Sequence, residues 1–356
     1  QMLDFEGRLY THHKKANVQF ASINTPLLGI DGDVDEDEKG FQLLLKATTE
    51  EDARWLTGFE FRQPKLVDTT THSFGSLEQH FLTAPENHRN IRALFGQYQD
   101  KVLQNINYTL GLRIDDYSDF GSHVSLRLGL IYQHAEHTFK LLYGEAFRAP
   151  TRAEANLLNN PVFTGNPELE PEIAKTVELI WLHQQQEQLW SATLYSTDIT
   201  EAINETTTTP RTRINEGRET IAGVEIDWQL EWDHHWKIRN AFTHIFDEAR
   251  EINSESSTLL TTSISFLTDK HSSNLTMNYQ SDKKDANTTV RGFNVYGGRS
   301  ILDASFTYFA SRDLDLYTKI KNLTDKRHVT PADRASNTAG VPIKGRTLEV
   351  GMHWRY

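Results

Sequence analysis

Apolar and polar residues alternate with a period of two along most of this chain. The last ten residues show it: Leu348, Val350, Met352, Trp354 and Tyr356 alternate with Thr347, Glu349, Gly351, His353 and Arg355. Successive side chains of a β-strand point to opposite faces of the sheet, so this period predicts strands with one apolar and one polar face. We therefore expect an all-β protein.

The same pattern predicts about 17 strands in the 356 residues. The expected strands are residues 2–12, 15–24, 40–50, 53–66, 89–102, 104–118, 122–134, 137–149, 173–185, 188–202, 219–232, 235–248, 257–268, 270–282, 299–312, 314–326 and 346–356.

Short connections between these strands alternate with long polar ones. The short turns are Thr11–Lys14, His134–His137, Asp233–Trp236 and Ser311–Asp313. The long loops are roughly residues 25–39, 67–88, 150–172, 203–218, 249–256, 283–298 and 327–345. This alternation places every long loop on one side of the sheet, which is typical of outer-membrane barrels. The sequence therefore predicts a transmembrane antiparallel up-and-down β-barrel.

Composition agrees with this prediction once the two faces of a strand are separated. Only 37% of residues are hydrophobic, and no stretch approaches the roughly 18 apolar residues of a membrane helix. In a barrel, however, only alternate residues meet lipid. The net charge of −12 argues against nucleic-acid binding, and the absence of cysteine excludes disulfides, thiolate metal sites and cysteine nucleophiles.

One segment carries motifs of a known family. The strand end Tyr143-Gly-Glu-Ala-Phe-Arg-Ala-Pro150 is followed by a loop and then by Gly165-Asn-Pro-Glu-Leu-Glu-Pro-Glu172. Asn215-Glu-Gly217, Lys321-Asn-Leu-Thr-Asp-Lys-Arg327 and Gly345-Arg346 follow in order. From about residue 105 to 356 the chain resembles the barrel of TonB-dependent outer-membrane receptors.

The resemblance implies a 22-stranded barrel with a plug inside it. Residues 1–356 are then expected to be the C-terminal portion of the barrel domain, without the plug, the TonB box and the first five or so strands. An odd strand number is itself unusual, because single-chain bacterial barrels close with an even number. The inward polar residues Arg113, Arg127, Lys140 and Lys319 are expected to face the plug.

The resemblance also implies a function. We expect a receptor in the outer membrane of a Gram-negative bacterium that takes up a scarce nutrient, most often a ferric siderophore. Its partners would be outer-membrane lipid and lipopolysaccharide, the TonB system through the plug, and a ferric chelate. No nucleic acid, cofactor or enzymatic activity is expected, since no nucleophile elbow, phosphate loop or HExxH motif is present.

Some motif residues are expected to hold the structure together. Arg148 is placed to pair with Glu145, Glu154 or Glu172 at the root of the 150–172 loop. The remaining structural candidates are Phe147, Pro150, Gly165, Asn166, Pro167, Leu169, Pro171, Asn322, Leu323 and Asp325, with Tyr356 in an interfacial aromatic girdle.

Other residues on the long-loop side are candidates for ligand binding. These are His72, His80, His88, Arg152, Asn160, Arg211, Arg213 and His328. The histidines are alternatively solvent-exposed loop residues, and their spacing of eight fits no compact metal site, so no metal is assigned. The two arginines are suited to an anionic ferric chelate, and equally to a polar loop.

The acidic run Asp31–Glu38 begins like a calcium loop but lacks the sixth-position glycine and has Gln42 at the position of the bidentate glutamate. It is interpreted as a solvated acidic loop, with an extracellular divalent-cation site as the alternative.

Other functions remain open at this point. A passive porin or structural barrel shares the strand pattern, and a soluble β-rich binding module shares the alternation. Receptors for haem, cobalamin or oligosaccharide share the family barrel. The absence of histidine from residues 151–165 argues against haem.

Overall fold

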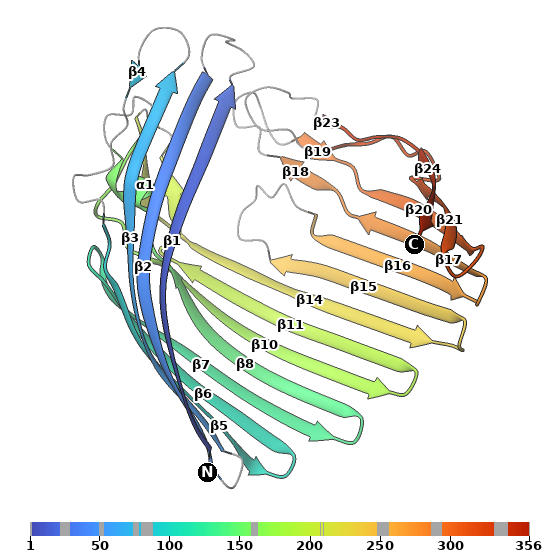
Figure 1. Cartoon of the computed structure of the whole chain (residues 1–356), viewed down its shortest axis with the longest axis horizontal. Coiled ribbons are helices and arrows are strands. Elements are labelled where there is room, and N and C mark those ends of the chain that lie inside the picture. The colour runs from blue at the N-terminus through green and yellow to red at the C-terminus, as the bar shows by residue number, and fades with distance from the viewer. Residues whose placement is uncertain are drawn as a thin grey trace. The chain divides into compact units, whose positions relative to one another are not determined.

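The computed structural model describes residues 2–21, 29–49, 53–73, 78–79, 88–157, 163–206, 208, 210–247, 256–285, 294–330 and 341–355. Within these ranges the single helix is α1 (Arg152–Asn156), and all other regular structure is β-strand (Figure 1). None of the described helical residues forms a segment long and apolar enough to cross a membrane.

The strands of the main sheet follow one another along the chain. They are β1 (Met2–Ala21), β2 (Gly29–Thr48), β3 (Arg54–Ser73), β4 (Glu78–Gln79), β5 (Ile91–Leu103), β6 (Ile106–Tyr117), β7 (Gly121–His134), β8 (His137–Arg148), β10 (Glu172–Gln185), β11 (Gln188–Thr200), β14 (Arg218–Glu231), β15 (Trp236–Asp247), β16 (Thr258–Leu267), β17 (His271–Gln280), β20 (Arg299–Phe309), β21 (Leu314–Lys321) and β24 (Thr347–Trp354).

The described ladders of this 17-stranded sheet are antiparallel, from β1–β2 to β21–β24. Each long strand pairs with the next long strand in the sequence, as in β5–β6 and β6–β7. This is the predicted up-and-down arrangement, so the fold prediction is confirmed. The number 17 includes the two-residue β4; sixteen of the described strands have eight or more residues.

Three small sheets lie within connections that the sequence predicts as long loops. β9 (Phe163–Thr164), β12 (Ile203–Glu205) and β13 (Arg211–Asn215) form one. β18 (Lys283–Asp285) pairs with β19 (Asn294–Tyr296), and β22 (Val329–Thr330) pairs with β23 (Val341–Pro342).

The N-terminal hairpin differs from the prediction. The sequence predicts two strands, residues 2–12 and 15–24, with a turn at Thr11–Lys14, but β1 runs unbroken through these positions to Ala21. The acidic run Asp31–Glu38, expected as loop, lies within β2. The predictions of the first turn and of most of the first loop are therefore wrong.

Opposite charges facing each other across the hairpin explain why these polar segments pair. Lys14 lies opposite Glu36 and Lys15 opposite Asp35, while His12 and His13 lie opposite Glu38 and Asp37. Directly opposed side chains of unlike charge stabilise an antiparallel ladder, typically by about 0.2–1 kcal/mol each. Each of the two segments, taken alone, is polar enough to be predicted as a loop. Paired with each other, they form a β-ladder.

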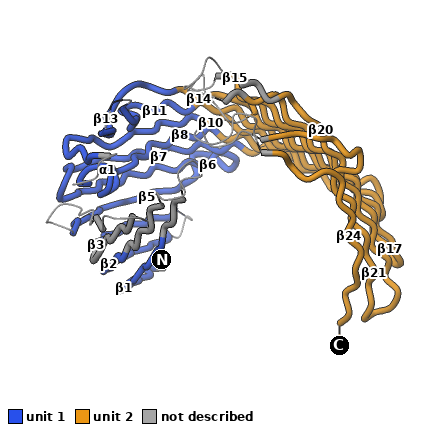
Figure 2. Tube along the Cα trace, turned by 90° about the horizontal axis from the view of Figure 1, so that it is seen from above, with its two compact units in different colours: residues 1–132, 141–177, 197–219 blue, residues 133–140, 178–196, 220–356 orange. Residues whose placement is uncertain are grey.

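The chain divides into two compact units (Figure 2). Unit 1 comprises residues 1–132, 141–177 and 197–219, and unit 2 comprises residues 133–140, 178–196 and 220–356. Unit 1 contains β1–β6, most of β7, α1 and the small sheet of β9, β12 and β13. Unit 2 contains most of β14 and all strands from β15 to β24.

Each unit has a sheet with one apolar and one polar face. On β6 of unit 1, Leu110 and Leu112 are 47% and 46% exposed. On β24 of unit 2, Leu348, Val350, Met352 and Trp354 are all more than 60% exposed. Large apolar side chains left uncovered in a row are what a lipid-facing strand presents. Very few apolar side chains among the described residues are buried, so the apolar surface is on the sheet face rather than in a core.

Glycines on the polar face accommodate aromatic rings from the neighbouring strand. Gly40 lies opposite Tyr10, and Gly351 lies opposite Tyr317. A Cβ atom at Gly40 would lie 2.5 Å from Tyr10 Cζ, and one at Gly351 would lie 2.5 Å from Tyr317 Oη. Gly58 with Phe95 and Gly223 with Tyr195 repeat the arrangement. An aromatic ring that covers a glycine shields its backbone and fixes the register of the ladder.

Candidate functional site

The root of the 149–171 connection is organised around Arg148, the last residue of β8. Its guanidinium group donates hydrogen bonds to Glu172, the first residue of β10, and to Glu154 in α1, where Nη1 lies 3.0 Å from Oε2. Glu172 also accepts a bond of 2.7 Å from the backbone N–H of Ile203. Glu145 instead pairs with Tyr143 and Lys175. Two of the three expected partners of Arg148 are therefore the ones it contacts.

The short helix α1 begins with a capping box. Thr151 accepts a hydrogen bond of 3.1 Å from the Glu154 N–H, and the Glu154 carboxylate accepts one of 2.8 Å from the Thr151 N–H. These reciprocal bonds satisfy N–H groups that a helix start leaves without partners. Arg152, a predicted ligand residue, is directed to Glu36 on β2, with Nη2 2.9 Å from Oε1.

Titration of this cluster follows from its contacts. Burial by itself raises the pKa of Glu154, but the bonds from the Thr151 N–H and from Arg148 outweigh it, so the pKa lies below the usual glutamate value. Burial lowers the pKa of Arg152, and the nearby Glu36 opposes that shift. Glu154 is therefore charged at neutral pH and serves as an acceptor for Arg148.

Arg89 fixes the segment that precedes α1, and sequence reasoning did not identify it. Its Nη2 donates a hydrogen bond of 2.9 Å to the carbonyl oxygen of Pro150, and its Nε lies 2.7 Å from Asp119. The side chain is 10% exposed, and Pro150 is fully buried. Arg89 follows the predicted 67–88 loop, and its partners are distant in sequence, so no local pattern marks it.

The second half of the motif closes back on the helix. The Gly165 N–H bonds to the carbonyl oxygen of Leu157 at 2.8 Å, and a Cβ at Gly165 would lie 2.4 Å from the Leu157 nitrogen. Asn166 accepts a bond from the Glu168 N–H and donates one of 2.9 Å to the carbonyl oxygen of Arg213. Leu169 is buried; Pro167 and Pro171 flank it.

The ligand candidates are not gathered into one place among the described residues. Arg211 and Arg213 both pair with Glu205, at 2.7 and 3.1 Å, which neutralises much of their charge. His88 is exposed, and it forms an isolated antiparallel β-bridge with Lys65. His328 Nδ1 lies 3.3 Å from the carbonyl oxygen of Lys326.

The side chains of three further ligand candidates and of one structural candidate lie outside the described residues. The backbone of His72 lies in β3, but its side chain is outside the description. His80 and Asn160 lie outside the described residues, as does Tyr356.

The motif before the last strand forms a turn with two left-handed residues. Asn322 and Asp325 have φ of 53°. The Asn322 side chain accepts a bond of 2.8 Å from the Lys326 N–H and donates one of 2.9 Å to its carbonyl oxygen. Asp325 accepts a bond of 2.8 Å from the Arg346 N–H, and Leu323 bonds through its N–H to Leu302. Asparagine and aspartate tolerate this backbone region better than other non-glycine residues.

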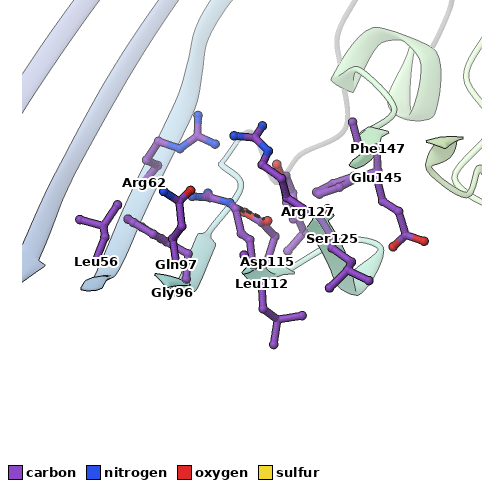
Figure 3. Close-up of a pocket in the computed structure, with 16 residues that line it drawn as sticks. Leu56, Arg62, Gly96, Gln97, Leu112, Asp115, Ser125, Arg127, Glu145 and Phe147 are labelled. Carbon is purple, nitrogen blue, oxygen red and sulfur yellow. Dashed lines mark hydrogen bonds and ion pairs between the residues drawn. The ribbon is translucent and has the colours of Figure 1, made fainter. Parts of the chain in front are cut away.

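Unit 1 has a pocket of about 510 Å³ against the polar face of β3 and β5–β8 (Figure 3). Arg62 and Arg127 direct their guanidinium groups to the same side of it. Phe95, Tyr117 and Phe147 supply aromatic surface, and the Phe147 ring lies edge-on to Tyr117 with centroids 5.7 Å apart. The volume falls within the range of small-molecule sites.

The charges lining this pocket are only partly paired. Arg113 donates two hydrogen bonds to Asp115, at 2.7 and 2.8 Å, and one of 3.0 Å to Glu60. Arg62 Nε lies 3.0 Å from Glu60. Within the described part of the chain, Arg127 has no hydrogen-bond or ion-pair partner. Among the described residues, the pocket therefore offers the Arg127 guanidinium group without a partner, next to a fixed network of charges.

These features define a class of protein. An antiparallel sheet with an apolar face, a polar face bearing a charged pocket, and elaborated connections on the loop side is the wall of a membrane barrel. Residues 3–324 match the family model described as TonB dependent receptor-like, beta-barrel. The chain belongs to this family, and the resemblance inferred from its motifs is confirmed.

This chain matches only part of the length of the following known relatives. The chain is 34% identical over 115 residues to the vitamin B12 transporter BtuB of Vibrio cholerae, a match that spans 32% of this chain and 18% of the transporter.

Among solved structures, the siderophore receptor PirA from Acinetobacter baumannii superposes with a TM-score of 0.76 at 16% identity. The match covers 99% of this chain and 60% of that receptor. The ferric enterobactin receptor PfeA of Pseudomonas aeruginosa in complex with enterobactin gives 0.75 at 16% identity, with 98% and 60% covered. The copper transporter OprC gives 0.77 at 13% identity, with 99% and 62% covered. At such identities the likeness establishes the fold alone.

Proposed function

We propose that this chain forms the wall of an outer-membrane receptor that takes up a ferric siderophore in a TonB-dependent manner. The observation that carries the proposal is the pocket of unit 1, where Arg127, which has no partner among the described residues, lies with Arg62 and an aromatic surface. Ferric chelates are commonly anionic, and a guanidinium group binds anionic oxygens through charge-assisted hydrogen bonds. The pocket thus combines charge and apolar surface for such a ligand.

The remaining features of the proposal concern partners. The exposed apolar face of each unit suits outer-membrane lipid and lipopolysaccharide in a Gram-negative envelope. Energy would reach the barrel from the TonB system through a plug that contacts the polar face. Arg113 is held rigidly by Asp115 and Glu60, so it presents a fixed surface to that partner.

Cobalamin is a second candidate ligand. The observation in its favour is the 34% identity to the vitamin B12 transporter of Vibrio cholerae, over 115 residues. The two candidate ligands differ in charge, because a corrinoid presents fewer anionic oxygens to Arg127 than an anionic ferric chelate does.

Uptake by whole cells separates these alternatives. Cells that lack their own receptors and carry the complete gene are given labelled ferric siderophores, labelled cyanocobalamin or a labelled oligosaccharide, with and without functional TonB. We expect TonB-dependent accumulation of iron from at least one ferric siderophore. Accumulation of cyanocobalamin alone would replace the siderophore by cobalamin, and TonB-independent entry of all probes would favour a porin.

A substitution in the pocket connects the ligand to the geometry. Arg127→Gln removes the free charge while keeping hydrogen-bonding groups, and we expect the concentration of siderophore at half-maximal uptake to rise about tenfold. The matched control is Arg92→Gln. Arg92 is an exposed residue of β5 that does not line the pocket, so this variant should leave uptake unchanged. Equal uptake by both variants contradicts a role for the pocket.

A further inference from the structure

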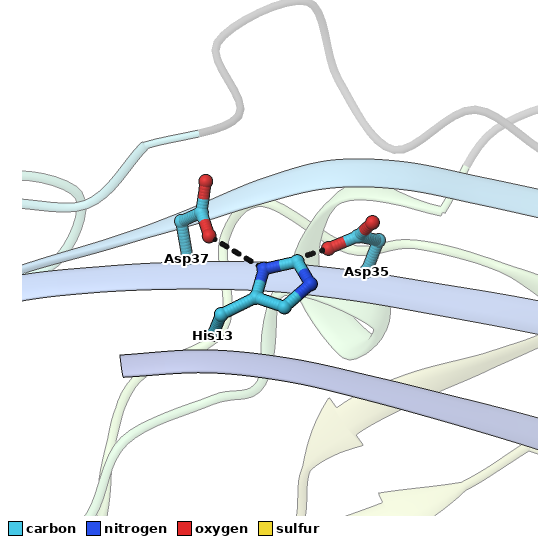
Figure 4. Close-up of side chains that lie close together, drawn as sticks. All are labelled: His13, Asp35 and Asp37. Carbon is cyan, nitrogen blue, oxygen red and sulfur yellow. Dashed lines mark hydrogen bonds and ion pairs between the residues drawn. The ribbon is translucent and has the colours of Figure 1, made fainter. Parts of the chain in front are cut away.

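A cluster of potential metal ligands lies on the N-terminal hairpin, apart from the pocket. His13 on β1 faces Asp35 and Asp37 on β2, and one ligand atom from each lies within 4.8 Å of the others (Figure 4). His13 Nδ1 is 2.8 Å from Asp37 Oδ1 and 3.4 Å from Asp35 Oδ1. Asp35 and Asp37 belong to the acidic run Asp31–Glu38, for which a divalent-cation site is the alternative to a solvated loop. His13 is more than 20 residues away in the sequence, and the ladder register brings it beside the two carboxylates.

The cluster lies on the apolar face of the hairpin, beyond its apolar residues. Leu9, opposite Phe41, and His13, opposite Asp37, are four residues apart on β1, so their side chains point to the same face. Four residues of strand correspond to about 13 Å. The three ligands therefore lie on the outer surface toward the loop side, where a strand that continues past lipid meets water and polar headgroups.

An ion pair between His13 and the carboxylates leaves one acceptor unused. The single Nδ1–H of a protonated His13 is directed to Asp37 at 2.8 Å. Lys15 Nζ lies 3.2 Å from Asp35 Oδ2. Asp35 Oδ1 is buried from solvent and accepts no hydrogen bond from the described groups, and it forms a long ion pair of 3.4 Å with His13 Nδ1. A buried carboxylate oxygen without a hydrogen bond costs free energy that a cation at this point would offset.

The spacing of the ligand atoms suits a first-row divalent cation. Metal–nitrogen and metal–oxygen bonds of about 2.0–2.2 Å place adjacent ligand atoms roughly 2.9–3.5 Å apart in octahedral or tetrahedral geometry. The separations of 2.8 and 3.4 Å between His13 Nδ1 and the two carboxylate oxygens need only small adjustments to reach this range. An imidazole with two carboxylates favours cations such as Zn²⁺ or Cu²⁺ over Mg²⁺ and Ca²⁺, which prefer oxygen alone.

We propose that His13, Asp35 and Asp37 bind one divalent transition-metal cation on the outer surface of the β1–β2 hairpin. Three protein ligands leave at least one coordination position to water. The cation joins the two strands where like-charged carboxylates crowd β2, and it is separate from the ligand pocket of unit 1. The site stands independently of the uptake function, because none of its residues lines that pocket.

Metal titration of the purified, detergent-solubilised protein without a histidine tag tests this site. Zn²⁺ is added and binding is followed by calorimetry, and Cu²⁺ is added to record the nitrogen hyperfine pattern by electron paramagnetic resonance. We expect His13→Asn, Asp35→Asn and Asp37→Asn each to weaken the strongest site at least about tenfold. The Cu²⁺ spectrum of the wild type should show one imidazole nitrogen that His13→Asn removes.

His12→Asn is the matched control, because His12 neighbours His13 but points to the opposite face of β1. It should bind Zn²⁺ as the wild type does. Equal binding by the His12 and His13 variants, or no site lost in any carboxylate variant, would overturn the proposal. Circular dichroism and heat-dependent gel migration verify that each variant is folded, and siderophore uptake is measured separately, so failure of one proposal leaves the other intact.

Discussion

Arg89 donates a hydrogen bond of 2.9 Å to the carbonyl oxygen of Pro150, 61 residues further along the chain. The bond joins the segment just before β5 to the loop root, and both groups are buried. A charged donor bonded to a buried carbonyl is expensive to remove, because the oxygen loses its partner together with the cation.

Arg89→Ala should therefore destabilise the protein by about 2–3 kcal/mol, since the carbonyl of Pro150 and the carboxylate of Asp119 both lose a donor. The measurement is urea unfolding in detergent micelles. Arg92→Ala, at an exposed position of β5, should change the unfolding free energy by less than about 0.5 kcal/mol. An equal effect of the two variants would mean that Arg89 does not hold the loop root.

Gly351→Ala tests the aromatic cover on the last strand. The new Cβ would lie 2.5 Å from Tyr317 Oη, so the ring must move, and we expect a loss of about 1–2 kcal/mol in unfolding free energy. Gly144→Ala is the control, because nothing lies within 4 Å of its Cβ position. In a Tyr317→Leu background the cost of Gly351→Ala should fall; an unchanged cost would place its origin elsewhere than the ring.

Asn322→Ala should destabilise the turn before the last strand by about 2 kcal/mol, because two hydrogen bonds to Lys326 are lost at a residue with positive φ. Asn322→Gly keeps the backbone conformation without the bonds, so it should fall between the wild type and alanine. Refolding yield into detergent, together with urea unfolding, gives the order. Alanine and glycine behaving alike would show that backbone conformation contributes little here.

Acidification should loosen the loop root. The pKa of Glu154 is lowered in the folded protein because hydrogen bonds from Thr151 and Arg148 outweigh the effect of burial. A carboxylate with a depressed pKa contributes stability above its unfolded pKa, about 4.3, and this contribution is lost as the pH falls through the folded value. Hydroxyl-radical footprinting of residues 149–171 should show constant protection from pH 8 to about 5 and declining protection below.

Glu154→Gln provides the comparison for this pH series. Its amide cannot gain a charge, so the variant should already show reduced protection at pH 7 and a weaker dependence on pH. A pH profile identical to that of the wild type would attribute the transition to another group.

Local pattern was sufficient where apolar and polar residues alternate. β6, β21 and β24 lie within their predicted ranges, and the turns at residues 134–137, 233–236 and 311–313 separate the strands as expected. Prediction from the local pattern failed where a strand carries charged residues along its length. The pattern predicts a turn at residues 11–14 and a loop that includes residues 35–39, because no single-segment pattern reports that Lys14 and Glu36 lie opposite each other.

The sequence by itself determined that this chain is an antiparallel barrel wall of the TonB-dependent receptor family, because alternation along a strand and short motifs are local properties. Only the tertiary structure decided which side chains meet. It selected Glu154 and Glu172 rather than Glu145 as the partners of Arg148, and it joined His13 to Asp35 and Asp37 across a ladder. Register and long-range hydrogen bonds depend on the free energy of whole strands pairing, which no single segment encodes.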